Sequence, residues 1–258
     1  MLVLIIGILI HYYLVGRVSL LFLVMCCLIV LIFSDDQTRI SSLQIHYIPI
    51  KTLPDSICNL ISLTSLSVSH NQLTALPESI GNLVSLTSLN VYDNQLSSLP
   101  DSIGNLSSLA KLSVYNNQLS SLPDSIGNLS CLKKLFINCS LTHLPYSIGN
   151  LSSLSYLNVF GNQLVQLPES IGDLVSLTYL SVYENELTRL PDSIGNLSSL
   201  THLYAGKNNL SVLPDSMQSL TSLSWLDLYG NPVIATERAR KEAFSRFSRV
   251  GLIIKMEL

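Results

Sequence analysis

Histidine, cysteine and serine are the residues of this 258-residue chain that could take part in acid–base, metal or nucleophilic chemistry. The five cysteines form no CxxC pair and no Cys/His group at the spacing of zinc ligands. The five histidines, which share no spacing, are His11, His46, His70, His143 and His202. Serines are abundant, but no GxSxG, phosphate-binding-loop, HExxH or kinase signature accompanies them. We therefore predict no catalytic residue, no metal site and no cofactor, and we do not expect an enzyme.

Aromatic side chains offer a different chemistry, the recognition of another molecule without a reaction. Several of them recur at the same interval along the sequence, as Tyr156 and Tyr179 do. Tyr and Trp are typical of binding hot spots because they bury a large area with few rotatable bonds. The alternative is that these rings only stabilise a sheet through cross-strand contacts. The candidate partner-binding residues, expected on the solvent-facing side of one sheet, are Tyr92, Tyr115, Phe136, Tyr156, Phe160, Tyr179, Tyr183, His202, Tyr204, Trp225, Asp227 and Tyr229. The equivalent positions nearer the N-terminus carry mainly serine. We therefore expect a protein or peptide partner to contact residues 156–229.

Asparagine recurs with the same spacing, and its expected role is structural. An amide at an inward turn can satisfy backbone groups of its own turn and of the neighbouring turns, which produces a ladder along the core. The expected ladder positions are Asn71, Asn94, Asn117, Cys139, Asn162, Asn185, Asn208 and Asn231. Cys139 stands where the pattern calls for asparagine, so we expect its thiol to face inward as a weak hydrogen-bonding partner.

These residues sit in a repeated unit. The stretch "LPDSIGNLSSL" begins at Leu99, and close copies begin at Leu53, Leu76, Leu122, Leu144, Leu167, Leu190 and Leu213. The copies are evenly spaced, except that the step from Leu122 to Leu144 is one residue shorter than the others. Self-similarity at a fixed period of about 20–50 residues indicates a solenoid.

One unit, read from Leu86, is "LTSLNVYDNQLSSLPDSIGNLSS". Residues 89–92 alternate apolar and polar, which predicts a short strand with one buried face. The proline of the LPDSI segment ends that regularity, and Asp-Ser-Ile-Gly can then form a helical or 3₁₀ turn with glycine at its exit. Because the next strand follows at once, successive strands must lie parallel and stack sideways.

The frame L-x-x-L-x-L-x-x-N-x-L-x-x-L-P-x-x-I resembles the leucine-rich repeat family in its 23-residue LPxxI form, and is closest to the intracellular Ras-group type. The resemblance extends over most of the chain, from Ile40 to Asn231. It implies an α/β-type solenoid, a curved horseshoe with a parallel β-sheet on the concave side and turns or 3₁₀ segments on the convex side. It also implies that proteins or peptides bind along the concave face.

Counting the frames predicts nine strands. The sequence from Ile40 fits a degenerate first repeat, with Ile48 in the asparagine position. The short step removes one residue between Ile137 and Leu141. We expect a local pinch in the ladder there and no break in the sheet.

Residues 1–34 form a separate segment. Residues 1–33 are almost wholly apolar apart from His11 and Arg17, and are long enough for one membrane span, or for two short ones with a turn at Arg17. We expect an uncleaved apolar helix that anchors the chain in a membrane as a single-pass protein. An atypical signal peptide, and hence a secreted protein, is the alternative. Arg17 on one side and Asp35–Asp36 on the other favour a cytoplasmic N-terminus, but leave the side of the repeats open.

Residues 35–232 form the predicted solenoid, and residues 233–258 a C-terminal capping helix and tail. Ala239, Ala243, Phe247 and Val250 share one helical stripe, and Thr236 can act as N-cap. The net charge of −3 gives no basic excess for nucleic acid, so none is expected as a partner. The chain is therefore predicted to be a membrane-anchored, non-catalytic protein-interaction module. The alternative is a secreted or surface-displayed structural repeat protein without a dedicated ligand.

Overall fold

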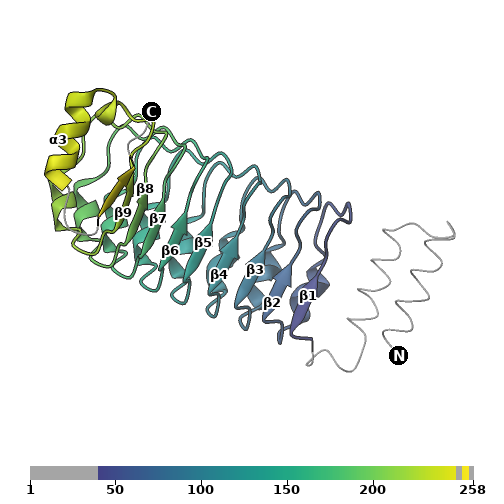
Figure 1. Ribbon diagram of the computed structural model, residues 1–258. Coiled ribbons are helices and arrows are strands. Elements are labelled where there is room, and N and C mark those ends of the chain that lie inside the picture. Colours follow the sequence, from purple (N-terminus) through teal and green to yellow (C-terminus); the bar gives the residue numbers. More distant parts are fainter. Residues whose placement is uncertain (1–39, 248–251, 256–258) are drawn as a thin grey trace.

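The described part of the computed structural model comprises residues 40–247 and 252–255. Its strands lie parallel in one ten-stranded sheet, in the order in which they occur along the chain (Figure 1). The strands are β1 (Ser42–Gln44), β2 (Ser65–Ser67), β3 (Ser88–Asn90), β4 (Lys111–Ser113), β5 (Lys134–Phe136), β6 (Tyr156–Asn158), β7 (Tyr179–Ser181), β8 (His202–Tyr204), β9 (Trp225–Asp227) and β10 (Ile253–Lys255). The predicted parallel solenoid is confirmed.

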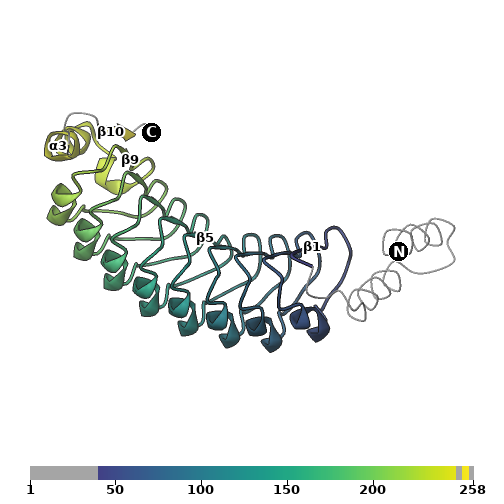
Figure 2. The same ribbon diagram turned by 90° about the horizontal axis from the view of Figure 1, so that it is seen from below.

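Short 3₁₀ helices connect the strands on the opposite side. Seen along the sheet, the strands follow the inner side of an arc and the 3₁₀ helices its outer side (Figure 2). The helices are η2 (Asp55–Asn59), η3 (Glu78–Asn82), η4 (Asp101–Asn105), η5 (Asp124–Asn128), η6 (Tyr146–Asn150), η7 (Glu169–Asp173), η8 (Asp192–Asn196), η9 (Asp215–Ser219) and η10 (Pro232–Ile234). The concave sheet and the convex 3₁₀ turns both follow the sequence-based expectation.

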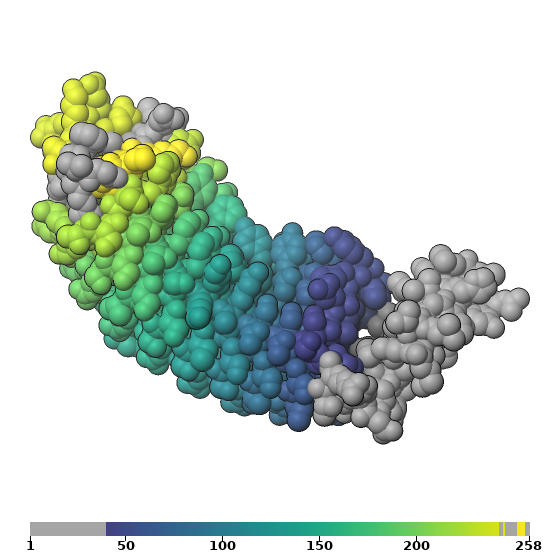
Figure 3. All heavy atoms as spheres, turned by 60° about the horizontal axis from the view of Figure 1, so that its bottom comes forward, coloured from purple at the N-terminus to yellow at the C-terminus, as the bar shows by residue number. Residues whose placement is uncertain are grey.

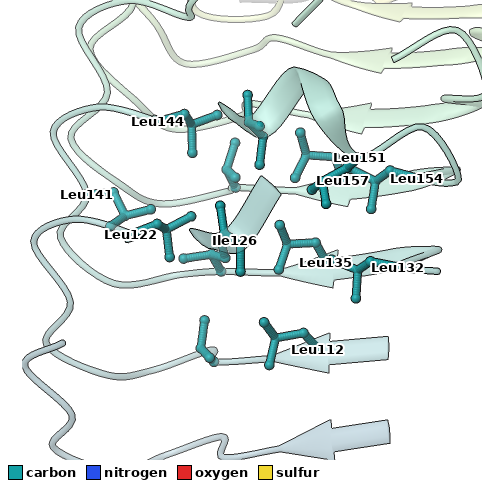
Figure 4. Packing of buried hydrophobic residues seen from close by; sticks show 14 of the residues in the cluster. Leu112, Leu122, Ile126, Leu132, Leu135, Leu141, Leu144, Leu151, Leu154 and Leu157 are labelled. Atoms are coloured by element: carbon teal, nitrogen blue, oxygen red, sulfur yellow. The ribbon is translucent and has the colours of Figure 1, made fainter. Parts of the chain in front are cut away.

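Leucine and isoleucine from strands, loops and 3₁₀ helices fill the space between the two faces. Leu112 and Leu135, on neighbouring strands, point toward Ile126 of η5 (Figure 4), and all three are 0% exposed. Burying such a side chain contributes about 2 kcal/mol. One repeat cannot offset the entropy of ordering its residues, so the core is stable only because neighbouring repeats share it. Figure 3 shows the described repeats as one continuous curved body.

Proline and glycine shape each convex turn. Pro100, at φ −68° and ψ 151°, precedes η4 and ends the extended segment before it. Gly104 does not act as the exit residue expected from the sequence. A Cβ atom built on it would lie 2.5 Å from the carbonyl oxygen of Ser125 in the next repeat. The glycine is therefore required because adjacent 3₁₀ helices approach each other closely.

The short step leaves the sheet unbroken, as predicted. Lys134 and Phe136 of β5 pair with Tyr156 and Asn158 of β6, in the same parallel register that joins the other strands. The missing residue is therefore accommodated in the turn that follows β5.

The C-terminal region differs from the expectation in one respect. Helix α3 (Glu237–Phe247) follows η10 and packs against η10 and η9. The Ala239 amide donates to the Thr236 hydroxyl oxygen at 3.1 Å, as expected for the N-cap. The prediction of nine strands was one short, because β10 returns from α3 and pairs with β9. Strand β10 carries no repeat frame, so the periodicity could not reveal it.

Two sequence-based expectations concern residues that the structure does not describe. The apolar segment of residues 1–33 lies outside the described residues, as do the side chains of Ala243 and Phe247 and the whole of Val250. Among the residues that are described, no helix is both long and apolar enough to cross a bilayer.

Candidate protein-binding face

The concave face is built from the first and third residues of each strand. In β2–β9 these flank a buried leucine, so their side chains share the solvent side of the sheet. The parallel register aligns them in two columns. The first column, from β2 to β9, reads Ser65, Ser88, Lys111, Lys134, Tyr156, Tyr179, His202 and Trp225. The second reads Ser67, Asn90, Ser113, Phe136, Asn158, Ser181, Tyr204 and Asp227.

The C-terminal half of this face carries a chain of aromatic contacts, which we call the aromatic row: Phe136, Tyr156, Tyr179, Tyr204 and Trp225. The rings of Tyr156 and Tyr179 stack with centroids 4.1 Å apart and planes inclined by 6°. Phe136 lies 5.0 Å from Tyr156, Tyr179 lies 5.1 Å from Tyr204, and Tyr204 lies 6.2 Å from Trp225. All five residues are half-buried, so one part of each residue still faces solvent.

The predicted site residues beyond the strand ends flank this row. Phe160 stacks on Tyr183 at 5.9 Å, and the ammonium of Lys207 lies 5.4 Å from the centre of the Tyr183 ring. Within the strands, His202 of β8 lies 6.3 Å from Tyr179 of β7.

Tyr92 and Tyr115 belong to a separate group near the N-terminal end. Their rings lie 6.1 Å apart. Two residues that the sequence analysis did not select extend the group: Tyr47 stacks on His70 at 4.5 Å, and His70 contacts Tyr92 edge-on at 4.9 Å. Tyr47 and His70 were missed because they occupy the positive-φ position directly before the ladder residue, which was not among the positions from which candidates were selected.

The aromatic row has a measurable electrostatic consequence. Burial raises the pKa of the Tyr179 phenol above its usual value, and the nearby phenols of Tyr156 and Tyr204 raise it further. The neutral ring is therefore favoured in the folded chain. At the edge of the face, a hydrogen bond that the Lys207 ammonium donates to the Tyr183 phenol oxygen and the charge of Glu184 raise the pKa of Lys207.

Asp227 differs from the expectation for a partner-binding residue. It is only 3% exposed, and its carboxylate accepts a hydrogen bond from the Tyr229 amide at 2.9 Å. Lys255 of β10 lies 3.7 Å from the same carboxylate and 5.5 Å from the Tyr229 ring. Because β10 covers this end of the sheet, Asp227 helps to hold the strand and is not available to a partner. The exposed surface at this end is instead formed by Ile253 of β10, which is 57% exposed and pairs with Trp225.

The asparagine side chains make a regular set of hydrogen bonds. Asn117 is typical: its amide donates to the Val91 and Val114 carbonyls at 3.0 Å each, and its side-chain oxygen accepts from the Leu96 amide at 3.0 Å. Asn94, Asn185, Asn208 and Asn231 each make the equivalent three hydrogen bonds, to two carbonyls and one amide at the corresponding positions of their own repeats and the preceding ones. Asn71 likewise bonds to the first repeat, through the Ile45 carbonyl and the Ile48 amide.

Cys139 occupies its ladder position with one hydrogen bond in place of several. Its thiol donates to the Val114 carbonyl at 3.2 Å. The side-chain oxygen of Asn162 accepts from both the Cys139 amide, at 3.0 Å, and the Leu141 amide, at 3.2 Å. Burial raises the pKa of the Cys139 thiol, although the backbone of Asn117, Leu119 and Asn138 opposes that shift.

The residue that the short step removes can be identified from the backbone. In the other described repeats the residue before the ladder position has a positive φ, for example Asn116 at 54° and Gly161 at 63°. Its amide donates to the next repeat, as Asn116 does to Asn138 at 2.7 Å. In the fifth repeat this residue is absent. The side-chain amide of Asn138 replaces its donor, and bonds to the Phe160 carbonyl at 3.0 Å.

No metal site appears in the described part of the chain: no three His, Cys, Asp or Glu side chains lie close enough together to hold an ion. The geometry of the concave face is that of a contact surface, with half-buried polar side chains on β2 and β3 and half-buried rings on β5–β9.

A curved solenoid with a parallel concave sheet and an asparagine ladder defines the leucine-rich repeat class of proteins. A sequence profile described as "Leucine-rich repeat region" matches residues 38–143, 81–163 and 138–242. The chain therefore belongs to the leucine-rich repeat family. The match does not specify a subtype, so the resemblance to the Ras-group repeats stays a prediction. No curated protein sequence matches the chain.

Solved structures similar to the chain include an internalin from Listeria monocytogenes, with 24% identity, a TM-score of 0.71 and coverage of 86% of this chain and 62% of the internalin. YopM from Yersinia enterocolitica is 35% identical, with a TM-score of 0.59 and coverage of 74% of this chain and 38% of YopM. The plant peptide hormone receptor RGFR1, solved in complex with RGF2, is 28% identical, with a TM-score of 0.59 and coverage of 75% and 36%. The chain thus spans less than two thirds of each of these three proteins.

Proposed function

We propose that this chain is a non-catalytic interaction module that binds a protein or peptide on its concave face. The observation that carries the proposal is the aromatic row, which places five half-buried rings side by side on the face of five consecutive strands. Core packing does not require them, because the leucines between them already fill the interior. Rigid rings with few rotors and a polar edge suit a protein-binding surface.

The similarity to RGFR1 agrees with this proposal. That receptor is described as a peptide hormone receptor in complex with RGF2, and the match is 28% identical over 75% of this chain and 36% of the receptor. The fold supplies the concave surface in both proteins, but the side chains of this chain decide which partner it binds.

Changing Tyr156, Tyr179, Tyr183 and Tyr204 to alanine tests the proposal. Partners captured by the full chain should be lost by this variant, while the far-ultraviolet circular dichroism spectrum stays that of a solenoid. Tyr146→Ala is the matched control, because Tyr146 is 70% exposed at the start of η6 on the convex side. Recovery of the same partners by the fourfold variant would rule out the concave face as the binding site.

A second candidate function is structural, and the stacking of Tyr156 on Tyr179 favours it. Rings that contact each other across strands can stabilise a sheet by about 0.2–1 kcal/mol per pair without binding anything. This reading predicts that the fourfold variant melts at a lower temperature and that the parent captures no specific partner from a lysate.

We further propose that residues 1–33 hold the module at a membrane, a proposal that depends on their apolar sequence. The full chain should pellet with membranes and resist carbonate extraction, and deletion of residues 1–34 should abolish both properties. A soluble product that begins near Ser34 would instead identify a secreted protein.

A further inference from the structure

The centre of the concave face carries two adjacent positive charges. Lys111 of β4 and Lys134 of β5 stand directly opposite each other in the parallel register, and both are exposed. Like charges at opposite positions on neighbouring strands destabilise a sheet. The equivalent residues of β2 and β3 are Ser65 and Ser88, so the fold itself does not require lysine in this column.

No carboxylate in the described part of the chain forms an ion pair with either lysine. The acids nearest to this face along the repeats have other partners: Asp93 bonds to His70 and Asn116, and Glu184 lies 3.7 Å from Lys207. Across the strand positions of β1–β9 the single acid is Asp227, which is buried and lies 3.7 Å from Lys255 of the neighbouring strand β10.

This arrangement opposes the charge of the rest of the solenoid. Residues 40–231 contain twelve Asp or Glu and only six Lys or Arg, yet the open part of the concave face offers cations without acids. The aromatic row begins beside them: Lys111 lies 5.7 Å from the Phe136 ring, and Lys134 pairs with Tyr156. A charged patch thus adjoins an aromatic one.

We propose that the concave face selects an acidic peptide segment, whose carboxylate binds between Lys111 and Lys134 and whose apolar or aromatic residues lie on the aromatic row. This inference rests on the proposed function and adds the chemistry of its partner. Charge complementarity identifies the acidic end, and the half-buried rings identify the apolar end.

The spacing of the strands fixes the spacing expected in the peptide. Strands are about 4.8 Å apart, so the distance from Lys134 on β5 to Tyr204 on β8 is about 14 Å. An extended chain covers about 3.3 Å per residue. A peptide that crosses the strands should therefore carry its Asp or Glu about one to five residues from a large apolar or aromatic residue.

Selection of a random dodecapeptide phage library on the purified full chain tests this inference. Enriched sequences should share an Asp or Glu at that distance from Phe, Tyr, Trp or Leu. The best sequence, made as a fluorescent peptide, should bind with an affinity that falls as salt increases. The double variant Lys111→Ser/Lys134→Ser should weaken its binding about tenfold, a loss that matches two exposed ion pairs.

The controls separate the charge from the scaffold. The serine variants copy residues that the second and third repeats already have, so their melting temperatures should equal that of the parent or exceed it once the repulsion between the two lysines is removed. Lys51→Ser, at an exposed lysine outside the concave columns, should leave the affinity within about twofold. A peptide with Gln in place of its Asp or Glu should bind the parent and the double-serine variant equally.

The outcomes also distinguish this inference from the proposed function. Enriched peptides without acids, or an affinity unchanged in the double-serine variant but lost in the fourfold tyrosine variant, would overturn the acidic-peptide proposal and leave the binding face standing. If no sequence is enriched, both proposals fail.

Discussion

Gly161 is the residue whose substitution should be most affected by the missing residue of the fifth repeat. It has φ +63°, and a Cβ atom built on it would lie 2.3 Å from the side-chain nitrogen of Asn138. That nitrogen replaces the absent backbone donor, and bonds to the Phe160 carbonyl at 3.0 Å and the Gly161 carbonyl at 3.3 Å. Gly161→Ala must therefore both strain the backbone and displace the amide.

The two contributions can be estimated separately. An alanine in the left-handed region costs about 1–2 kcal/mol. Loss of the two Asn138 hydrogen bonds adds about 1–2 kcal/mol, since each is worth roughly 1 kcal/mol. Gly161→Ala should then cost about 2–4 kcal/mol. Gly230 provides the matched control: it has φ +72°, but its built Cβ meets nothing closer than 3.4 Å. Gly230→Ala should cost only the backbone term, about 1–2 kcal/mol.

Equilibrium urea unfolding of the single and double variants measures the difference. In the Asn138→Ala background there is no amide to displace, so Gly161→Ala should cost no more than Gly230→Ala. The double-mutant cycle should therefore give a coupling of about 1 kcal/mol or more between Asn138 and Gly161. Equal costs for the two glycine variants in both backgrounds would refute the idea that the Asn138 amide substitutes for the missing residue.

Four further predictions follow from the same geometry. Cys139→Asn should raise the melting temperature or leave it unchanged. A thiol reagent should label Cys139 more slowly than the exposed Cys131, because the Cys139 side chain lies in the ladder. Rapid labelling of Cys139 would contradict its assignment to the ladder. Insertion of an asparagine after Asn138 should change the free energy of unfolding little in urea titrations, because the inserted backbone amide can replace the side-chain donor. Gly104→Ala should lower the stability by about 1–3 kcal/mol in the same assay, since its Cβ has no room beside the next 3₁₀ helix. The raised pKa of Tyr179 means that the unfolded chain loses this proton first, so its contribution to stability should be complete below about pH 10 and be lost as the pH rises further. Tyr179→Phe should remove a phenol that titrates above the ordinary tyrosine range in an ultraviolet absorbance titration.

The repeated frame allowed most of the solenoid to be predicted. The leucines of the frame are buried, and the alternation around Leu112 gives a strand with one solvent face. The concave columns could be aligned from sequence spacing alone, even across the short step, because parallel pairing keeps equivalent positions side by side. Thr236 was identified as the N-cap of α3 because it is a local signal that needs no tertiary context.

The features that could not be predicted depend on contacts between segments that share no pattern. Strand β10 consists of three residues without a repeat frame, and its position beside β9 makes Asp227 a buried partner of Lys255. The spacing locates the missing residue between Ile137 and Cys139, but the hydrogen bond by which the Asn138 side chain replaces its backbone donor depends on a contact with the next repeat. The glycines of the 3₁₀ helices looked like exit residues because the close approach of the next repeat is invisible in one unit.

The comparison of repeats within the chain bears on whether the concave face has a ligand. Duplication alone would leave exposed positions as similar among the repeats as buried ones. That largely holds on the convex side: the exposed last residue of the 3₁₀ helices η2–η9 is asparagine in every case except Asp173 and Ser219. On the concave face it fails: the column that begins with two serines continues with two lysines, two tyrosines, His202 and Trp225, although a leucine follows each of these residues along the chain. Exposure is common to both sides, so exposure does not explain the difference. A surface that has diverged from repeat to repeat, on a scaffold that has not, is the pattern expected if each repeat contributes a different contact to one extended partner.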